Sequence, residues 1–145
     1  MEIVPITKNN VSECAETFRA SYNQHPWNYK WKLQDAVKYL GEYVDSPHFI
    51  GFMLYEDDHV PGALLGHTKT WWTNNQFFID ELFIAPTAQG HGYGKLLLKH
   101  IEAYAQAYNL KLISLMTNKF MPAMQFYNKN DFTKVDQYVF MFKQL

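Results

Sequence analysis

Residues 85–100 read APTAQGHGYGKLLLKH, and this stretch decides which fold the chain is expected to adopt. Gly90, Gly92 and Gly94 stand at every second position, and a lysine and an apolar, helix-like run follow them. A helix N-terminus leaves backbone N–H groups unpaired and carries partial positive charge. Glycines let a ligand approach those groups because they carry no Cβ. The stretch therefore predicts a phosphate or pyrophosphate site at the start of a helix.

Two common phosphate-binding motifs do not fit this stretch. A P-loop, G-x-x-x-x-G-K-[ST], would need glycine in place of Gln89 and Ser or Thr in place of Leu96. A dinucleotide fingerprint, G-x-G-x-x-G, would need its third glycine in place of Lys95 or Leu97. The pattern that does fit is [Q/R]-x-x-G-x-[G/A], which spans residues 89–94.

The rest of the chain predicts one α/β domain over residues 1–145, with strands and helices on either side of the glycine stretch. Strands are expected at 2–6, 49–55, 60–72, 77–85 and 110–117, with two further strand-like pieces within 132–143. Helices are expected at about 11–22, 33–44, 94–109 and 121–130. Asn10 and Glu13 have the spacing of a capping box before the first helix. This order favours a mixed, mostly antiparallel sheet with helices on both faces.

Composition narrows the class of protein further. The chain has 145 residues, 48% of them hydrophobic, and a net charge of -1, so it can form a core and offers no basic surface for nucleic acid or membrane lipid. The single cysteine, Cys14, is expected to be a small buried residue, and the six histidines lack metal-binding spacing, so no metal is expected. No signal peptide or membrane span is predicted, which favours a cytoplasmic protein.

With a strand before the glycines, a helix after them and AMQFYNKNDF at 123–132, the sequence resembles the GNAT superfamily of acyl-CoA-dependent N-acyltransferases. The resemblance covers about 77–132, and residues 2–72 match it only in element order. It implies that acetyl-CoA is the donor and that a small-molecule amine is the acceptor.

The resemblance also assigns residues to the coenzyme. The amides of the glycine turn would hold the pyrophosphate, and backbone in the preceding strand would pair with the pantetheine arm where two strands separate. The residues concerned are Leu82, Phe83, Ile84, Gln89, Gly90, His91, Gly92, Tyr93, Gly94 and Lys95. His91 has two interpretations, a phosphate ligand or a surface residue of the turn. Asn118 is a candidate for a family asparagine whose own position is Phe120 here.

Tyr127 aligns with the family tyrosine that lies near the sulfur, so the resemblance implies that it protonates the leaving thiolate. The alternative is an aromatic ring that only packs beside Phe126. Asp131 stands where the family has a glycine, and aspartate tolerates left-handed backbone better than most residues do.

Asp80 and Glu81 are the candidates for the catalytic base. Strict strand alternation puts Asp80 on one face with Leu82, and Glu81 on the other with Ile79, so only one would face the acceptor. A bulge in this strand would break that rule, and the family alignment favours Asp80 slightly. Either carboxylate could instead be a solvated or ion-paired structural residue.

Aromatic residues complete the predicted site. Trp27, Tyr29, Trp31, Trp71 and Trp72 fall where this family builds its acceptor pocket, and they could bind a cation by cation–π contacts, or could pack in the core or a dimer interface. The predicted function is direct acetyl transfer to a primary amine, first a polyamine-like or aminoglycoside-like one and second a protein or peptide amine. A non-catalytic CoA-binding sensor is the rival hypothesis, and a homodimer is possible.

Overall fold

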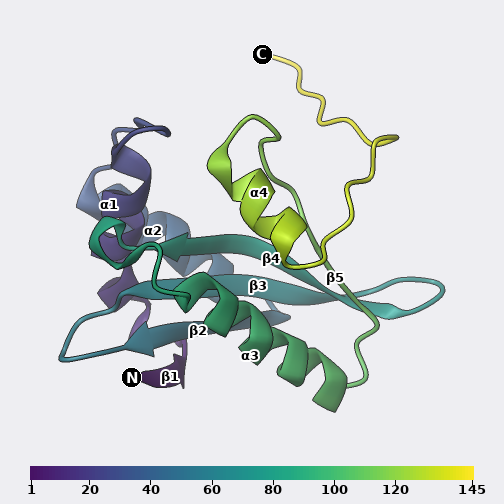
Figure 1. Ribbon diagram of the computed structural model, residues 1–145, viewed down its shortest axis with the longest axis horizontal. Coiled ribbons are helices and arrows are strands. Elements are labelled where there is room, and N and C mark those ends of the chain that lie inside the picture. Colours follow the sequence, from purple (N-terminus) through teal and green to yellow (C-terminus); the bar gives the residue numbers. More distant parts are fainter.

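A computed structural model describes residues 1–145 as a five-stranded sheet with helices on both faces (Figure 1). The strands, in both sequence and spatial order, are β1 (Glu2–Pro5), β2 (Phe49–Tyr55), β3 (Gly62–Thr70), β4 (Asn75–Ile84) and β5 (Leu112–Leu115). Neighbours are antiparallel except β4 and β5, which are parallel. The predicted mixed, mostly antiparallel sheet is therefore confirmed.

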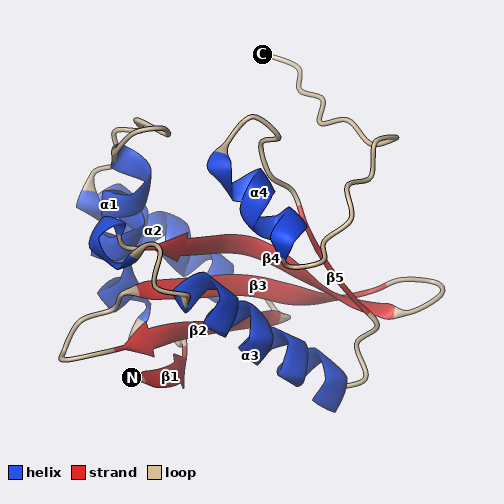
Figure 2. Ribbon diagram, viewed as in Figure 1, coloured by secondary structure: helices blue, strands red, loops and turns tan.

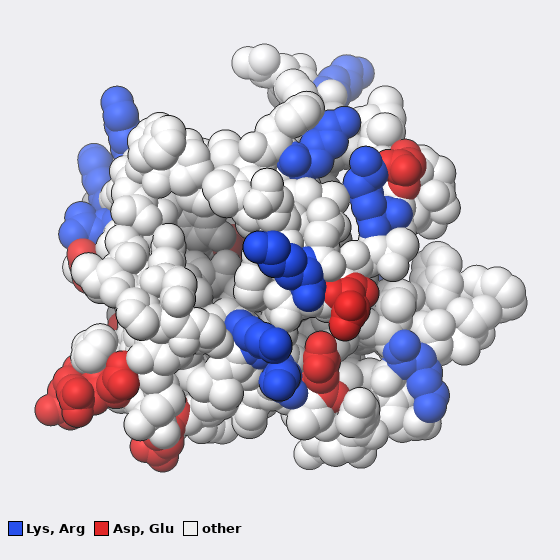
Figure 3. Space-filling model, viewed as in Figure 1, with Lys and Arg blue, Asp and Glu red and all other residues white.

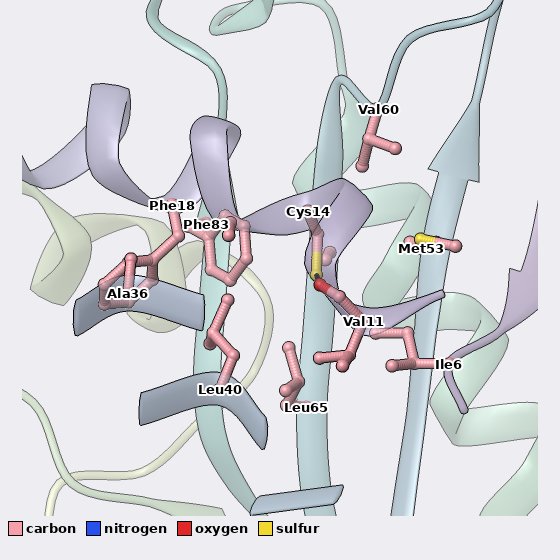
Figure 4. Packing of buried hydrophobic residues seen from close by; sticks show 12 residues of the cluster. Ile6, Val11, Cys14, Phe18, Ala36, Leu40, Met53, Val60, Leu65 and Phe83 are labelled. Carbon is pink, nitrogen blue, oxygen red and sulfur yellow. Dashed lines mark hydrogen bonds between the residues drawn. The ribbon is translucent and has the colours of Figure 1, made fainter. Parts of the chain in front are cut away.

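The helices divide between the two faces of the sheet (Figure 2). They are α1 (Ala15–Asn23) after the 3-10 turn η1 (Val11–Cys14), α2 (Leu33–Val44), α3 (Tyr93–Ala107) after the turn η2 (Pro86–Ala88), and α4 (Pro122–Lys129). Because side chains alternate across a strand, neighbours such as Leu64 and Leu65 enter different cores. One core lies under α1 and α2 and includes Cys14, Phe18 and Phe83 (Figure 4), and the other lies under α3.

The parallel pair β4–β5 is short, and its end opens the sheet. Pairing runs only from Gln76↔Leu112 to Ile79↔Leu115, and beyond this point the two strands separate (Figure 1). β4 continues to Ile84 with β3 on its other side. The last part of β4 therefore has one edge without a strand partner.

A bulge interrupts β4 at its centre. Leu65 pairs with Glu81 and the next residue, Gly66, pairs with Ile79, so Asp80 has no partner on β3. Side-chain alternation changes across this point: Ile79 belongs to the core under α3, while Phe83 belongs to the core under α1 and α2. The extra residue thus reverses which side chains face each layer.

The predicted capping box before the first helix is wrong. The Oδ1 atom of Asn10 accepts a hydrogen bond from the Thr7 N–H at 2.7 Å, and its Nδ2 donates to the Pro5 carbonyl at 3.0 Å. Asn10 therefore closes the turn between β1 and the helix and makes no side-chain cap bond.

The two strand-like pieces predicted within 132–143 are also wrong. No strand follows α4, and the chain runs from Phe132 to the C-terminus away from the body (Figure 1, yellow). Its apolar residues lie exposed, among them Phe140 at 74% and Phe142 at 82%. Apolar and aromatic residues favour a strand only where another strand pairs with them, and this segment has none beside it.

None of the helices combines the length and apolar character that crossing a bilayer requires.

Candidate active site

The glycine turn before α3 presents a run of free backbone amides. No N–H group of residues 89–95 has a hydrogen-bond acceptor in the chain, and the first helical bond runs from the Leu96 N–H to the Gly92 carbonyl at 3.0 Å. Gly90 and Gly92 have φ of 81° and 82°, and a Cβ added to either would meet nothing within 4 Å. The amides therefore border open space at a helix N-terminus, which fits an anionic group such as a pyrophosphate.

Gly94 has a second role beside the one its spacing suggests. A Cβ at this position would lie 2.9 Å from Cζ of Phe126 on α4. Gly94 thus leaves room for the Phe126 ring of α4, while its N–H group remains free like those of its neighbours.

Side chains of the turn contact the end of β4 and the 3-10 turn η2. Gln89 Nε2 donates to the Ile84 carbonyl at 3.2 Å, and His91 Nδ1 lies 3.1 Å from the Ala88 carbonyl oxygen. The second ring nitrogen of His91 and the ammonium of Lys95 have no partner in the chain and are exposed. These two groups are free to contact an anion held on the amides.

The open edge of β4 continues from this turn. Leu82 and Phe83 lie where β5 has already left the sheet. The Ile84 carbonyl oxygen differs from its neighbours, because it accepts from Ser21 Oγ at 2.8 Å as well as from Gln89. Figure 3 shows the surface hollowed over β4, between α1 and α4. A pantetheine-like arm could add to the edge here, but not through this carbonyl.

Tyr127 lies on α4 and is 9% exposed, and the ring centroids of Phe126 and Phe132 are both 5.3 Å from its own. Its hydroxyl has no hydrogen-bond partner in the chain. Burial raises the pKa of Tyr127, and the charge of Glu81 raises it further, so the phenol keeps its proton. Asp131 adopts φ of 68° just after α4, which confirms the left-handed turn predicted there.

Glu81 faces α1 and α2 and is enclosed by phenols. Its Oε1 accepts from Tyr39 at 2.5 Å and its Oε2 accepts from Tyr22 at 3.0 Å. Burial raises the pKa of Glu81, the two phenols lower it in part, and the nearby charge of Asp80 raises it. Sequence reasoning did not find Tyr22 and Tyr39 as partners, because each lies on a helix far along the chain from β4.

Asp80 lies on the same side of the sheet as Glu81. Its Oδ2 is 2.7 Å from Nδ1 of His67 on β3, and both carboxylates raise the pKa of Tyr43 on α2, whose burial is the main cause of the shift. The prediction that only one carboxylate faces this side, with Glu81 grouped with Ile79, is wrong because the bulge reverses the alternation. His67 was not assigned a role from the sequence, which holds no local signal for it.

The aromatic residues separate into two groups. Trp27 packs edge-on against Tyr22 at 5.4 Å, and Trp31 packs against Phe18 and Tyr39, so both belong to the aromatic cluster of α1 and α2 that includes the two phenols bound to Glu81.

Trp71 and Trp72 lie elsewhere, and their predicted place in the acceptor pocket is wrong. They are 56% and 85% exposed at the tip of the β3–β4 hairpin, which projects from the opposite end of the sheet to the loop before α2 (Figure 1). The length of β3, nine residues, carries them away from the site.

Asn118 occupies the turn before α4. Its Oδ1 accepts from the Phe120 N–H at 2.9 Å, and Phe120 itself is 84% exposed. The Asn118 amide nitrogen has no partner in the chain, and Oδ1 keeps one acceptor position.

Comparison with solved structures supports this fold. The chain is similar to an integron cassette protein from V. cholerae, with 20% identity, a TM-score of 0.83 and coverage of 99% of this chain and 91% of that one. It is also similar to an aminoglycoside acetyltransferase from an uncultured soil metagenomic sample, solved in complex with sisomicin, with 15% identity, a TM-score of 0.78 and coverage of 99% and 95%. A possible acetyltransferase from Clostridium difficile 630 gives 13% identity, a TM-score of 0.81 and coverage of 99% and 97%.

No curated protein matches the sequence. The sequence model of the Acetyltransferase (GNAT) family matches residues 11–132, which include the glycine turn, the bulged strand and Tyr127. The chain belongs to the GNAT acetyltransferase family.

Proposed function

We propose that this protein transfers an acetyl group from acetyl-CoA directly to a primary amine of a small cationic molecule. The observation that carries the proposal is the run of free amides at 89–95, which lies at the end of the unpaired edge of β4. Family membership supports acetyl transfer as the class of reaction.

The donor would lie along the glycine turn and the open edge of β4. The amides of the glycine turn hold its pyrophosphate, and backbone of Leu82 and Phe83 pairs with its pantetheine arm. When bound, acetyl-CoA supplies an activated acyl group as a thioester. The amine nitrogen attacks the thioester carbon, the C–S bond breaks, and Tyr127 gives its proton to the departing sulfur. Its free hydroxyl suits this role, and its raised pKa means that the phenol still carries its proton when the thiolate departs.

The acceptor would enter from the side of α1 and α2. Two carboxylates, Asp80 and Glu81, face this side, and the aromatic rings of Trp27 and Tyr22 lie beside them. Carboxylates and aromatic faces together attract ammonium groups. An aminoglycoside acetyltransferase among the similar structures agrees with a polyamine-like or aminoglycoside-like acceptor.

Direct transfer follows from the absence of an acyl carrier in the site. Cys14 is 0% exposed, its Sγ contacts the Val11 carbonyl oxygen at 3.0 Å, and burial raises its pKa to about 12. A thiol of this kind does not form the reactive thiolate. Both substrates would therefore bind before chemistry occurs.

The test is an assay of free thiol released from acetyl-CoA over a panel of polyamines, aminoglycosides and lysine peptides. We expect turnover with a small polycation and intersecting lines in double-reciprocal plots. Parallel lines would contradict direct transfer. Tight acetyl-CoA binding without release by any amine would identify a CoA-binding module instead.

We also propose that the protein is a cytoplasmic homodimer. The exposed apolar segment 135–142 supports self-association, because large exposed apolar patches mark contact surfaces. The buried, unpaired thiol of Cys14 is consistent with a reducing compartment.

A further inference from the structure

The two carboxylates of the bulge have different partners, and this difference assigns their roles. Both oxygens of Glu81 accept hydrogen bonds from phenols, Tyr39 and Tyr22. Asp80 instead contacts an imidazole, with 2.7 Å between its Oδ2 and His67 Nδ1. The side chain of His67 is 35% exposed and that of Asp80 is 14% exposed. The carboxylate is thus covered by a ring that itself reaches solvent.

We propose that His67 is the general base that deprotonates the acceptor ammonium, and that Asp80 is its positioning residue. This inference rests on the proposed acetyl transfer and names the residue that prepares the acceptor. It also assigns Glu81 to holding Tyr22 and Tyr39 in the wall of the site.

The hydrogen bond sets the tautomer of the ring. When His67 is neutral, Nδ1 carries the proton and donates it to Asp80, which leaves the lone pair of Nε2 free. Nε2 takes one proton from the ammonium, and the neutral amine then attacks the thioester carbon. The second proton leaves the nitrogen as the C–S bond breaks and replaces the one that Tyr127 gives to sulfur. The imidazolium formed is stabilised by Asp80 and returns its proton to water.

The surroundings of the ring hold it in place with few competing charges. Phe78, its register partner on β4, packs against it with 5.5 Å between ring centroids. On β2 its register partner is the uncharged Phe49. Titratable groups on this side include Asp80 and Glu81 from β4, Tyr22 from α1, and Tyr39 and Tyr43 from α2. The two carboxylates raise the pKa of Tyr43, after its burial. Asp80 is the one that contacts the ring, so it fixes which ring nitrogen of the neutral imidazole carries the proton.

Glu81 is poorly suited to the same task. A carboxylate whose two oxygens each accept a phenol must break a hydrogen bond to take a proton from substrate, and leaving a buried phenol without its partner costs about 1–3 kcal/mol. His67 Nε2 needs no such rearrangement.

The kinetic test is the pH profile of kcat/KM for the wild type, His67→Gln and Asp80→Asn, with His59→Gln as a control on an exposed turn. We expect His67→Gln to lose about 10²-fold and to lose the acidic limb of the profile. Asp80→Asn should keep that limb and should lose less activity than His67→Gln does, because the ring is still present but has lost the carboxylate that orients it. His59→Gln should match the wild type. An unchanged limb in His67→Gln would overturn the proposal.

A second measurement does not depend on turnover. Nitrogen-15 NMR of the histidine rings reports the tautomer of His67. We expect the Nδ1–H tautomer in the wild type, and a loss of this preference in Asp80→Asn, whose amide can donate to Nδ1 as well as accept from it. An Nε2–H tautomer in the wild type, or the same tautomer preference in Asp80→Asn, would overturn the dyad. A dyad confirmed by NMR in a protein that acetylates no amine would instead overturn the proposed function.

Discussion

Burial sets the protonation of single residues at this site. It raises the pKa of Glu81 and of Tyr127, and the charge of Glu81 adds to the effect on Tyr127. A phenol in this state can give a proton to a thiolate but cannot take the first proton from the acceptor ammonium. The proton donor and the proton acceptor must therefore be different residues, and His67 supplies the group that Glu81 and Tyr127 do not.

Replacing Tyr127 by phenylalanine tests the proton donor. The hydroxyl has no partner in the chain, so Tyr127→Phe should keep its melting temperature and its affinity for acetyl-CoA. We expect kcat to fall about 10²-fold with little change in KM, because the proton matters mainly in the transition state. Tyr138→Phe, in the exposed tail, is the matched control. Full turnover by Tyr127→Phe would make Tyr127 a packing residue.

Replacing Glu81 by glutamine tests its burial through the pH dependence of stability. The folded-state pKa of Glu81 is raised above 4.5, so the folded chain binds its proton more tightly than the unfolded chain does. This group then makes stability fall as pH rises from about 4.5 to the folded-state pKa. Glu81→Gln should lower stability overall, since it disturbs two phenol hydrogen bonds, but should remove that slope. Chemical denaturation at several pH values measures the free energy of unfolding. If its dependence on pH is the same in Glu81→Gln as in the wild type, the pKa of Glu81 is not raised in the folded chain.

Among the elements, the turn before α3 tests the phosphate site. Asparagine tolerates left-handed backbone, so Gly92→Asn should keep the φ of 82° and the fold while placing a side chain in the open space over the amides. We expect affinity for acetyl-CoA to fall at least tenfold, or ~1.4 kcal/mol. Calorimetric titration measures this. If the folded variant binds acetyl-CoA with wild-type affinity, the amides of this turn do not form the binding site.

Two positions further on, Gly94 tests the contact between α3 and α4. A valine there would collide with Phe126, so Gly94→Val should lose about 1–3 kcal/mol of stability. Phe126→Leu makes room for the valine. Gly94→Val should therefore cost less stability in the Phe126→Leu background than in the wild type. Additive effects of the two changes, measured by urea denaturation, would show that the two residues are not in contact.

In the whole molecule, two cores on opposite faces of one sheet supply the stability, and the C-terminal segment contributes to neither. Deleting 135–145 should therefore leave the melting temperature nearly unchanged. Because the segment exposes apolar side chains, we expect the full chain to associate with itself and the shortened chain to be monomeric. Light scattering after gel filtration measures both masses. A monomeric full chain would contradict the proposed homodimer.

Local patterns in the sequence determined much of this protein. The periodicity of apolar residues gave the order of elements as far as α4, and Gly90, Gly92 and Asp131 take the left-handed backbone that their residue types permit. These features depend on neighbours along the chain, so residue type and spacing are enough to predict them.

The tertiary structure alone decided how the site is arranged. Glu81 meets Tyr22 across 59 residues of sequence and Tyr39 across 42, and Asp80 meets His67 across 13. A bulge of one residue turned both carboxylates to the same side, and the lack of a pairing strand left the tail exposed. Such contacts depend on how strands pair and layers pack, which spacing along the chain does not encode.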